Sequence, residues 1–255
     1  MTEPLFTGVG VALVTLFDDD GGVDADGTAG LAAELEAAGV QAIVVAGSTG
    51  EAATLDGAER VALTKAVGDA VDVPVIVGTG APSARQAARL TMEVVAAGAD
   101  AVLVLSPPGA ASPVDYYAEV VRAADGAVPV MAYHFPSMSA PGIDVSLLPK
   151  LVEVGAAGIK DSSGDAARLV RSLDVFDGWL YVGSPWLLSA AGPLGATGAI
   201  LAVANVEPAL SIAAFAGDVA AQRALTPAAL AAGPVAVKRL LAERTGRSSR
   251  VRVGG

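Results

Sequence analysis

The sequence has 255 residues, of which 53% are apolar and 17% are charged, and its formal net charge is -11. This acidic balance argues against nucleic acid and anionic membrane surfaces as partners. The chain has no cysteine and one histidine, His134, which excludes a thiolate nucleophile, a cysteine-bound zinc ion and a His-rich metal site. We therefore expect no metal and no cofactor.

The first eight residues lack the basic flank and apolar run of a signal peptide. No segment has eighteen uninterrupted apolar residues, the minimum for a membrane-spanning helix. These features predict a cytoplasmic protein.

Apolar runs and helical patterns alternate along the chain. We expect strands at residues 9–15, 41–46, 73–77, 101–105, 128–133, 157–160, 180–182 and 198–202. We expect helices at residues 24–38, 56–71, 82–97, 113–124, 146–154, 165–173 and 185–191, and from about 207. Asp56 and Glu59 have the spacing of a capping box at one helix start. Eight strands, each followed by a helix, predict an α/β protein with a closed (β/α)8 TIM barrel.

A short repeat supports closure of the barrel. Four junctions from helix to strand share one pattern, which begins at Gly39, Gly98, Gly155 and Gly195 and precedes strands two, four, six and eight. Inward side chains of such barrels are layered by alternate strands, so a signature on every second strand fits closure. The alternative, an open doubly wound sheet, does not require it.

The chain has no linker long enough to mark a second large domain. We expect the barrel to occupy residues 1–217 and a shortened C-terminal helical extension to occupy residues 218–255. Within the extension, Thr226 and Pro227 open a helix that runs to about Arg244. The basic, Ser/Gly-rich residues from Gly246 to Gly255 are expected to be frayed.

Lys160 closes the sixth predicted strand. A buried ammonium is costly unless it is paired or neutralised, whereas a neutral amine is a nucleophile for carbonyl carbon. About one exposed lysine side chain in 2500 is neutral at pH 7, so such an amine needs a bias of roughly 4 kcal/mol against its charge. Apolar walls from Ile159, Val182 and Ile200 would supply it. The alternative is a lysine that reaches solvent or pairs with a carboxylate such as Asp161.

Tyr133 closes the fifth predicted strand, 27 residues before Lys160. Adjacent strands are spaced about 4.8 Å apart, so the phenol and the amine can meet. Tyr133 would then pass protons to and from a carbinolamine. The alternative is a core tyrosine whose hydroxyl is satisfied elsewhere.

The turn from Gly47 to Glu51 follows the second predicted strand. Its backbone N–H groups and the hydroxyls of Ser48 and Thr49 are suited to holding a small carboxylate, although such turns are also frequent as plain connections. No Walker A or dinucleotide-binding pattern is present, so nucleotide cofactors are not expected.

Several segments in the same order resemble the dihydrodipicolinate synthase / N-acetylneuraminate lyase family, from about Gly8 to Lys238. They are the opening 8–24, Gly47-Ser48-Thr49-Gly50-Glu51, Tyr133 with Pro136-Ser137, the run 158–165, and 195–198 with Ala204-Asn205-Val206.

The resemblance implies a barrel in which Lys160 forms a Schiff base with pyruvate or another 2-oxo acid, with an aldehyde as second substrate. It implies that Tyr133 is the proton shuttle and that Thr49 relays protons. Substrate-binding residues would be Gly47, Ser48, Thr49, Gly183 and Ile200. It also implies a homodimer or homotetramer.

Three departures affect the substrate. The family's synthases carry an arginine where this chain has Met138, and a tyrosine in the loop after strand four where this chain has Ser106-Pro107-Pro108-Gly109-Ala110. The chain is also shorter than typical members after the barrel.

These departures argue against a lysine-biosynthetic role. The run from Lys160 to Asp165 and the segment Ala204-Asn205-Val206 resemble the family's aldolase branches, which implies a pyruvate-dependent aldolase acting on a 2-oxo acid such as 4-hydroxy-2-oxoglutarate or a 2-keto-3-deoxy sugar acid. One alternative is dihydrodipicolinate synthase, which condenses pyruvate with aspartate semialdehyde. A second alternative is a non-catalytic barrel that binds 2-oxo acids.

Overall fold

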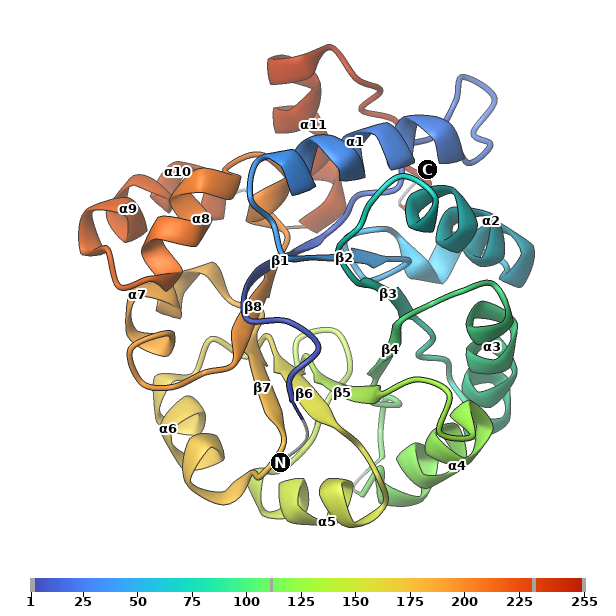
Figure 1. Cartoon of the computed structure of the whole chain (residues 1–255), viewed down its shortest axis with the longest axis vertical. Coiled ribbons are helices and arrows are strands. Elements are labelled where there is room, and N and C mark those ends of the chain that lie inside the picture. The colour runs from blue at the N-terminus through green and yellow to red at the C-terminus, as the bar shows by residue number, and fades with distance from the viewer. Residues whose placement is uncertain (1–2, 111, 231–232, 254–255) are drawn as a thin grey trace.

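Eight parallel strands form a closed barrel in the computed structural model, which describes residues 3–110, 112–230 and 233–253 (Figure 1). The strands are β1 (Gly8–Ala12), β2 (Ala42–Val45), β3 (Val75–Gly78), β4 (Ala101–Leu105), β5 (Val130–His134), β6 (Gly158–Asp161), β7 (Trp179–Val182) and β8 (Gly198–Leu201). Each strand pairs with the next in the chain, and β8 pairs with β1. The predicted (β/α)8 barrel is confirmed, and the open sheet is wrong.

Helices form the outer ring of the barrel (Figure 1). They are α1 (Ala25–Ala37), α2 (Gly57–Gly68), α3 (Ala84–Ala96), α4 (Val114–Ala124), α5 (Leu148–Glu153), α6 (Ala166–Val175), α7 (Leu188–Ala191) and α8 (Pro208–Phe215). The predicted capping box is present at α2, where Asp56 accepts from the Glu59 amide and Glu59 accepts from the Asp56 amide. Both α5 and α7 are shorter than predicted because a 3-10 turn precedes each of them.

The core has two layers, one inside the barrel and one between the strands and the helices. Inside the barrel, the ring of Phe6 stacks on Tyr181 with their centroids 4.5 Å apart. The Tyr181 hydroxyl donates to the Phe6 carbonyl oxygen at 2.9 Å. The segment before β1 therefore closes the N-terminal end of the barrel, which leaves the opposite, C-terminal end for ligands.

The four glycines of the repeat have one backbone conformation. Their φ angles are +97° at Gly39, +98° at Gly98, +94° at Gly155 and +99° at Gly195. Residues with a Cβ rarely adopt this left-handed region, which explains why glycine ends these four helices.

The C-terminal region differs from the expected single helix. It contains α9 (Val219–Ala224), which the sequence did not predict, and then α10 (Thr226–Ala229) and α11 (Gly233–Thr245) in place of one helix from Thr226 to Arg244. Gly233 has a φ of +83°, a conformation that a continuous helix does not contain. Residues 231–232 lie outside the described part of the chain. The division of the chain at residue 217 stays a prediction.

The last described residues also differ from the expected frayed tail. Backbone amides of Arg252 and Val253 donate to the carboxylate of Glu51 at 2.7 and 2.9 Å. The Arg247 side chain forms an ion pair with Glu34 at 2.5 Å. Residues 247–253 are therefore attached to the barrel, whereas residues 254–255, which were also expected to be frayed, lie outside the described part.

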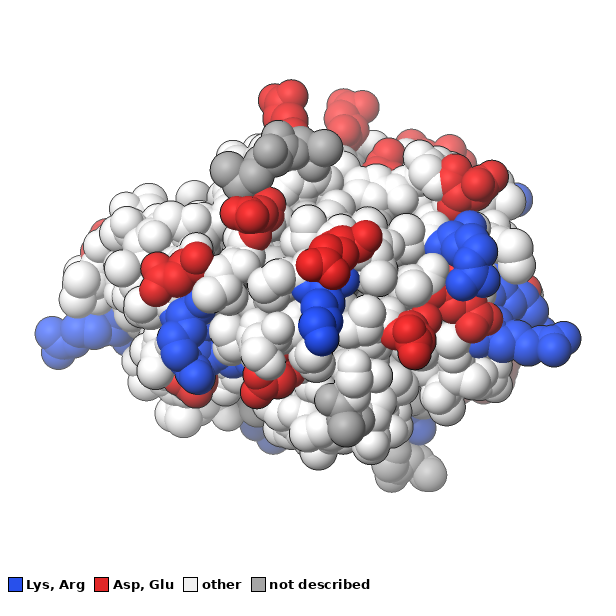
Figure 2. Space-filling view, turned by 90° about the horizontal axis from the view of Figure 1, so that it is seen from below, with Lys and Arg blue, Asp and Glu red and all other residues white. Residues whose placement is uncertain are grey.

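Acidic and basic side chains are interspersed on the face that Figure 2 shows, with no continuous basic surface. Among the helices of the described residues, none has both the length and the apolar character needed to cross a bilayer.

Candidate active site

Lys160 and Tyr133 lie side by side at the C-terminal end of the barrel. They are paired residues in the register of β5 and β6. The Lys160 Nζ lies 4.5 Å from the centroid of the Tyr133 ring. Only 5% of Lys160 and 4% of Tyr133 is exposed, so the amine and the phenol meet inside the protein.

No carboxylate pairs with Lys160 among the residues that the structure describes. Asp161 points to the other face of β6, where its Oδ2 accepts from the Nε of Arg168 at 2.5 Å. The alternative in which Lys160 pairs with Asp161 is therefore wrong. The Lys160 amine is therefore buried without an anionic partner among the described residues.

Ser162 is a site residue that the sequence analysis did not single out. Its hydroxyl donates to the Tyr133 phenolic oxygen at 3.3 Å. A phenol that accepts this bond keeps its own proton for a ligand. Residues two apart on a strand face the same side, so the spacing of Lys160 and Ser162 was the available signal.

Gly183 lies directly against the amine. A Cβ built at this position would stand 2.8 Å from the Lys160 Cε and 2.0 Å from the Ser162 Oγ. Both distances are below contact, so any side chain here must displace Lys160, which lies over the Tyr133 ring, and Ser162, which binds the Tyr133 hydroxyl.

Replacing Gly183 by alanine should therefore lower kcat by about 10²-fold, because an ångström-scale shift of a reacting group has an effect of this size. The free energy of unfolding should change little, since the displaced atoms are ends of flexible side chains. Gly30→Ala is the matched control, because a Cβ there meets nothing within 4 Å. Steady-state kinetics of both variants measures the effect. A wild-type kcat in Gly183→Ala would show that the space beside Lys160 does not matter for turnover.

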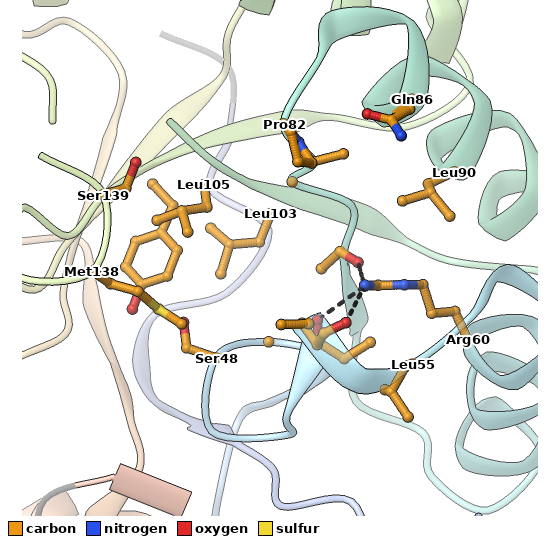
Figure 3. A pocket seen from close by; sticks show the side chains of 18 of the residues that line it. Ser48, Leu55, Arg60, Pro82, Gln86, Leu90, Leu103, Leu105, Met138 and Ser139 are labelled. Carbon is orange, nitrogen blue, oxygen red and sulfur yellow. Dashed lines mark hydrogen bonds between the residues drawn. The ribbon is translucent and has the colours of Figure 1, made fainter. Parts of the chain in front are cut away.

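The turn from Gly47 to Glu51 is held at both ends by the guanidinium of Arg60. Its Nη1 donates to the carbonyl oxygens of Ala46 and Gly78 at 3.3 and 2.5 Å, and its Nη2 donates to that of Ala52 at 2.5 Å (Figure 3). Ala46 has a left-handed φ of +50°, so the chain turns sharply as it leaves β2. Sequence analysis missed Arg60, because these contacts are visible only in three dimensions.

Ser48 and Thr49 are half-buried at the middle of this turn. Within the described residues, the side-chain hydroxyls of both are free of hydrogen bonds, which leaves them available to a ligand. No hydrogen bond joins Thr49 to Tyr133 or Lys160 there, and the hydroxyl that binds the Tyr133 phenol is that of Ser162.

A cavity of about 570 Å³ opens beside the Tyr133 ring, over the C-terminal ends of β2 to β5 and the starts of α2 and α3. Its lining includes Gly47, Ser48, Tyr133 and Met138 (Figure 3). Lys160 does not line it, so the amine and the cavity meet through their common neighbour, Tyr133.

The structure thus brings together most of the predicted site. Gly47, Ser48 and Tyr133 share the cavity, and Gly183 and Lys160 are in contact. Ile200 is fully buried inside the barrel, in the same apolar cluster as Tyr133. Thr49, next to Ser48 in the chain, is not among the residues that line the cavity.

His134 serves structure rather than proton transfer. Its Nδ1 accepts from the Ile143 amide at 2.8 Å. Burial, and next the positive charge of Arg168, lowers the pKa of His134 to about 4, so the ring is neutral at pH 7. No group of acidic or histidine side chains in the described residues is arranged to hold a metal ion.

Comparison with known proteins gives one consistent result. Residues 5–228 match the model of the dihydrodipicolinate synthetase family. A DapA-like lyase of Halobacterium salinarum is 37% identical over 217 residues, which cover 82% of this chain and 70% of that protein. A 4-hydroxy-tetrahydrodipicolinate synthase of Natronomonas pharaonis is 35% identical over 243 residues, which cover 88% of this chain and 80% of that protein.

Solved structures agree with the sequence relatives. The crystal structure of a chloride-inhibited dihydrodipicolinate synthase from Acinetobacter baumannii, complexed with pyruvate, superposes with a TM-score of 0.90 at 27% identity. The match covers 98% of this chain and 92% of that one. YagE, a prophage protein of the same family from E. coli K12 in complex with pyruvate, has a TM-score of 0.87 at 29% identity, with coverage of 99% and 93%.

Proposed function

Because the chain belongs to the dihydrodipicolinate synthetase family, whose members are pyruvate-dependent lyases, we propose that Lys160 is its Schiff-base lysine and that the physiological substrate is a 2-oxo acid with a neutral aldehyde half. The observation that carries the first part is a buried amine with no anionic partner in the described residues, set against the ring of a buried tyrosine.

The proposed reaction begins with attack of the Lys160 amine on C2 of the 2-oxo acid. The carbonyl oxygen takes a proton and a carbinolamine forms; loss of water then gives the imine. Tyr133 lies close enough to the amine to give and recover these protons, and the Ser162 hydroxyl leaves the phenolic proton free to be donated. A base then takes the proton of the C4 hydroxyl as the C3–C4 bond breaks, so the bonding electrons form an enamine and the aldehyde leaves. Protonation of the enamine at C3 restores an imine, and its hydrolysis returns pyruvate and the amine.

The carboxylate of the 2-oxo acid is proposed to bind at the turn of Gly47, Ser48 and Thr49. The two hydroxyls make no hydrogen bond within the described residues, and backbone N–H groups of such turns suit anions. Thr49 is proposed to relay protons, and Gly183 and Ile200 to shape the space around the amine.

The aldehyde half is proposed to be neutral because both arginines that line the cavity in the described residues, Arg60 and Arg89, already have partners. Arg60 already donates to three backbone carbonyl oxygens. Arg89 pairs with Glu93 on its own helix at 3.6 Å. Met138, which extends toward Ser48 in Figure 3, offers no hydrogen-bond donor. These features favour a 2-keto-3-deoxy sugar acid over 4-hydroxy-2-oxoglutarate.

Dihydrodipicolinate synthase remains the second candidate, because a relative that is 35% identical carries that function's name. It would condense pyruvate with aspartate semialdehyde, whose carboxylate would meet the same two engaged arginines.

A screen of 2-oxo acids, with released pyruvate measured through lactate dehydrogenase, tests the proposal. We expect kcat/KM to be at least about tenfold higher for a 2-keto-3-deoxy sugar acid than for 4-hydroxy-2-oxoglutarate. Product from pyruvate and aspartate semialdehyde at a higher efficiency would support the synthase instead. Thermal stabilisation by pyruvate without turnover of any substrate would indicate a non-catalytic binding barrel.

Replacing Met138 by arginine should narrow or cancel this preference. A guanidinium at the cavity wall would supply two charge-assisted donors, worth roughly 1.5 to 3 kcal/mol, to a second carboxylate. We expect kcat/KM for 4-hydroxy-2-oxoglutarate to rise about tenfold or more in the same assay, with that for the neutral substrate unchanged or lower. Equal changes for both substrates would show that Met138 does not face the aldehyde half.

We further propose that the protein works as a homodimer or homotetramer in the cytoplasm, as the family resemblance suggests. Large apolar side chains that are exposed in the single chain, such as Trp186 at 49% and Leu194 at 52%, support association. Light scattering of the purified protein would measure its mass.

A further inference from the structure

Glu51 ends the turn that carries Ser48 and Thr49, and its side chain points away from the cavity. Its backbone is left-handed, with φ +58° and ψ +39°. Its carboxylate is completely buried. Burying a carboxylate costs free energy unless several hydrogen-bond donors surround it. The folded protein must therefore supply such donors to Glu51.

Among the described residues, the donors to this carboxylate all come from the C-terminal part of the chain. Lys238 of α11 donates from Nζ to Oε1 at 2.5 Å. The amides of Arg252 and Val253 donate to Oε2 at 2.7 and 2.9 Å. Lys238 also donates to the carbonyl oxygen of Arg250 at 2.8 Å, so one ammonium joins the turn to residues 250–253, the C-terminal segment.

The Arg252 side chain fixes the C-terminal segment at a second point. Its guanidinium binds both carboxylate oxygens of Glu59 at 2.7 and 2.9 Å. It also donates to the carbonyl oxygens of Gly21 and Thr54 at 2.8 and 3.1 Å. Both cations also lie against the Phe17 ring: Arg252 Cζ is 4.5 Å and Lys238 Nζ is 4.1 Å from the ring centroid. The segment thereby ties the loop before α1 to the start of α2.

Other contacts hold the same turn from the barrel side. The Thr15 hydroxyl donates to the Gly50 carbonyl oxygen at 2.7 Å. The Arg60 guanidinium donates to the carbonyl oxygens of the residues that flank the turn. Ser48 and Thr49 have no side-chain hydrogen bonds of their own within the described residues. The direction of their hydroxyls and amides is therefore set by the backbone, which Glu51 anchors on the outer side.

We propose that the C-terminal segment, acting through Lys238 and Glu51, fixes the turn of residues 47–51 and thereby sets the affinity for the carboxylate of the 2-oxo acid. This inference rests on the proposed binding role of Ser48 and Thr49. Glu51, Lys238 and the segment are positioning groups, because none of them faces the cavity. Removing one partner of a buried ion pair lowers stability, so the free energy of unfolding of each variant is measured beside its affinity, under conditions in which the variant is folded.

The test measures how labelling of Lys160 depends on pyruvate concentration, with borohydride as the trapping reagent and the intact mass as readout. The variants are Glu51→Gln, which removes the charge but keeps the shape, and deletion of residues 250–255. Arg247→Ala is the matched control, because it breaks the ion pair of Arg247 with the exposed Glu34 and leaves the Glu51 contacts in place.

We expect the pyruvate concentration for half-maximal labelling to rise about tenfold or more in Glu51→Gln and in the deletion, with wild-type labelling at saturating pyruvate. Arg247→Ala should keep the wild-type value. If the deletion variant fails to fold, the half-saturation value of Glu51→Gln alone tests the inference.

A wild-type half-saturation value in Glu51→Gln would overturn the inference while leaving the proposed function intact. An equal rise in Arg247→Ala would also overturn it, since the effect would then be general to the tail. A wild-type chain that pyruvate and borohydride fail to label would instead remove the proposed function, and the inference with it.

Discussion

Replacing Lys160 by alanine should lower kcat by about 10³-fold or more, because no other described residue of the eight strands is a lysine that could form an imine. Lys160→Met is the sharper variant, since methionine keeps most of the side-chain volume and removes only the amine. Its free energy of unfolding should equal or exceed that of the wild type, because a group that prefers to be charged is no longer buried. Pyruvate release and chemical denaturation measure the two effects.

Turnover above about 1% of wild type in both variants would contradict the role of Lys160, since residual catalysis of that size exceeds what binding alone supplies to a covalent mechanism. If Lys160→Ala fails to fold but Lys160→Met folds, the loss of side-chain volume in the alanine variant is the cause.

Replacing Tyr133 by phenylalanine should lower kcat by about 10² to 10⁴-fold, the range for loss of a positioned acid–base group. The ring should stay in place, because it stacks on Phe135 with centroids 5.8 Å apart and lies against Lys160. Only the hydroxyl that meets Ser162 is lost. Steady-state kinetics, together with borohydride labelling at long incubation, should show slow rather than absent imine formation.

Tyr117→Phe provides the matched control. Its hydroxyl is fully buried and donates to the Val104 carbonyl oxygen at 3.0 Å, so its removal should cost about 1 kcal/mol of stability. Because this hydroxyl also bonds the backbone of Tyr133, its loss should lower kcat by less than about tenfold, far less than Tyr133→Phe. A similar fall in kcat for both variants would mean that the Tyr133 effect is structural and not chemical.

The barrel was predictable because its signals are local. Runs of β-branched residues, helix caps such as Asp56 and left-handed glycines such as Gly39 each act within a few residues of the chain. The regions that failed depend on distant contacts. The helix expected from Thr226 to Arg244 has a left-handed residue at Gly233, and the tail is held by Glu51, about two hundred residues away in the sequence.

The same distinction holds for the site. Lys160 and Tyr133 were found because residues that close adjacent strands of a parallel sheet must meet, and their register confirms that they are paired. Arg60 and Lys238 were not found, because each acts on the turn after β2 from another helix. Nothing in the local sequence distinguishes them from ordinary surface cations.

The specificity argument also depends on contacts between elements. The substitution of methionine at position 138 suggests a neutral substrate, but an arginine elsewhere in the cavity would have cancelled that argument. The structure shows that Arg60 and Arg89 are both engaged by other groups. This is why we expect Met138→Arg to shift the substrate preference by itself.

The central claim is that the Lys160 amine attacks the carbonyl carbon of pyruvate. Incubation of the full chain with pyruvate and borohydride, followed by proteolysis and peptide mass spectrometry, tests it most directly. We predict the mass of one reduced pyruvyl group on the peptide that contains Lys160 and on no other peptide. An unmodified Lys160 peptide at saturating pyruvate, or a label on a different lysine, would contradict the account.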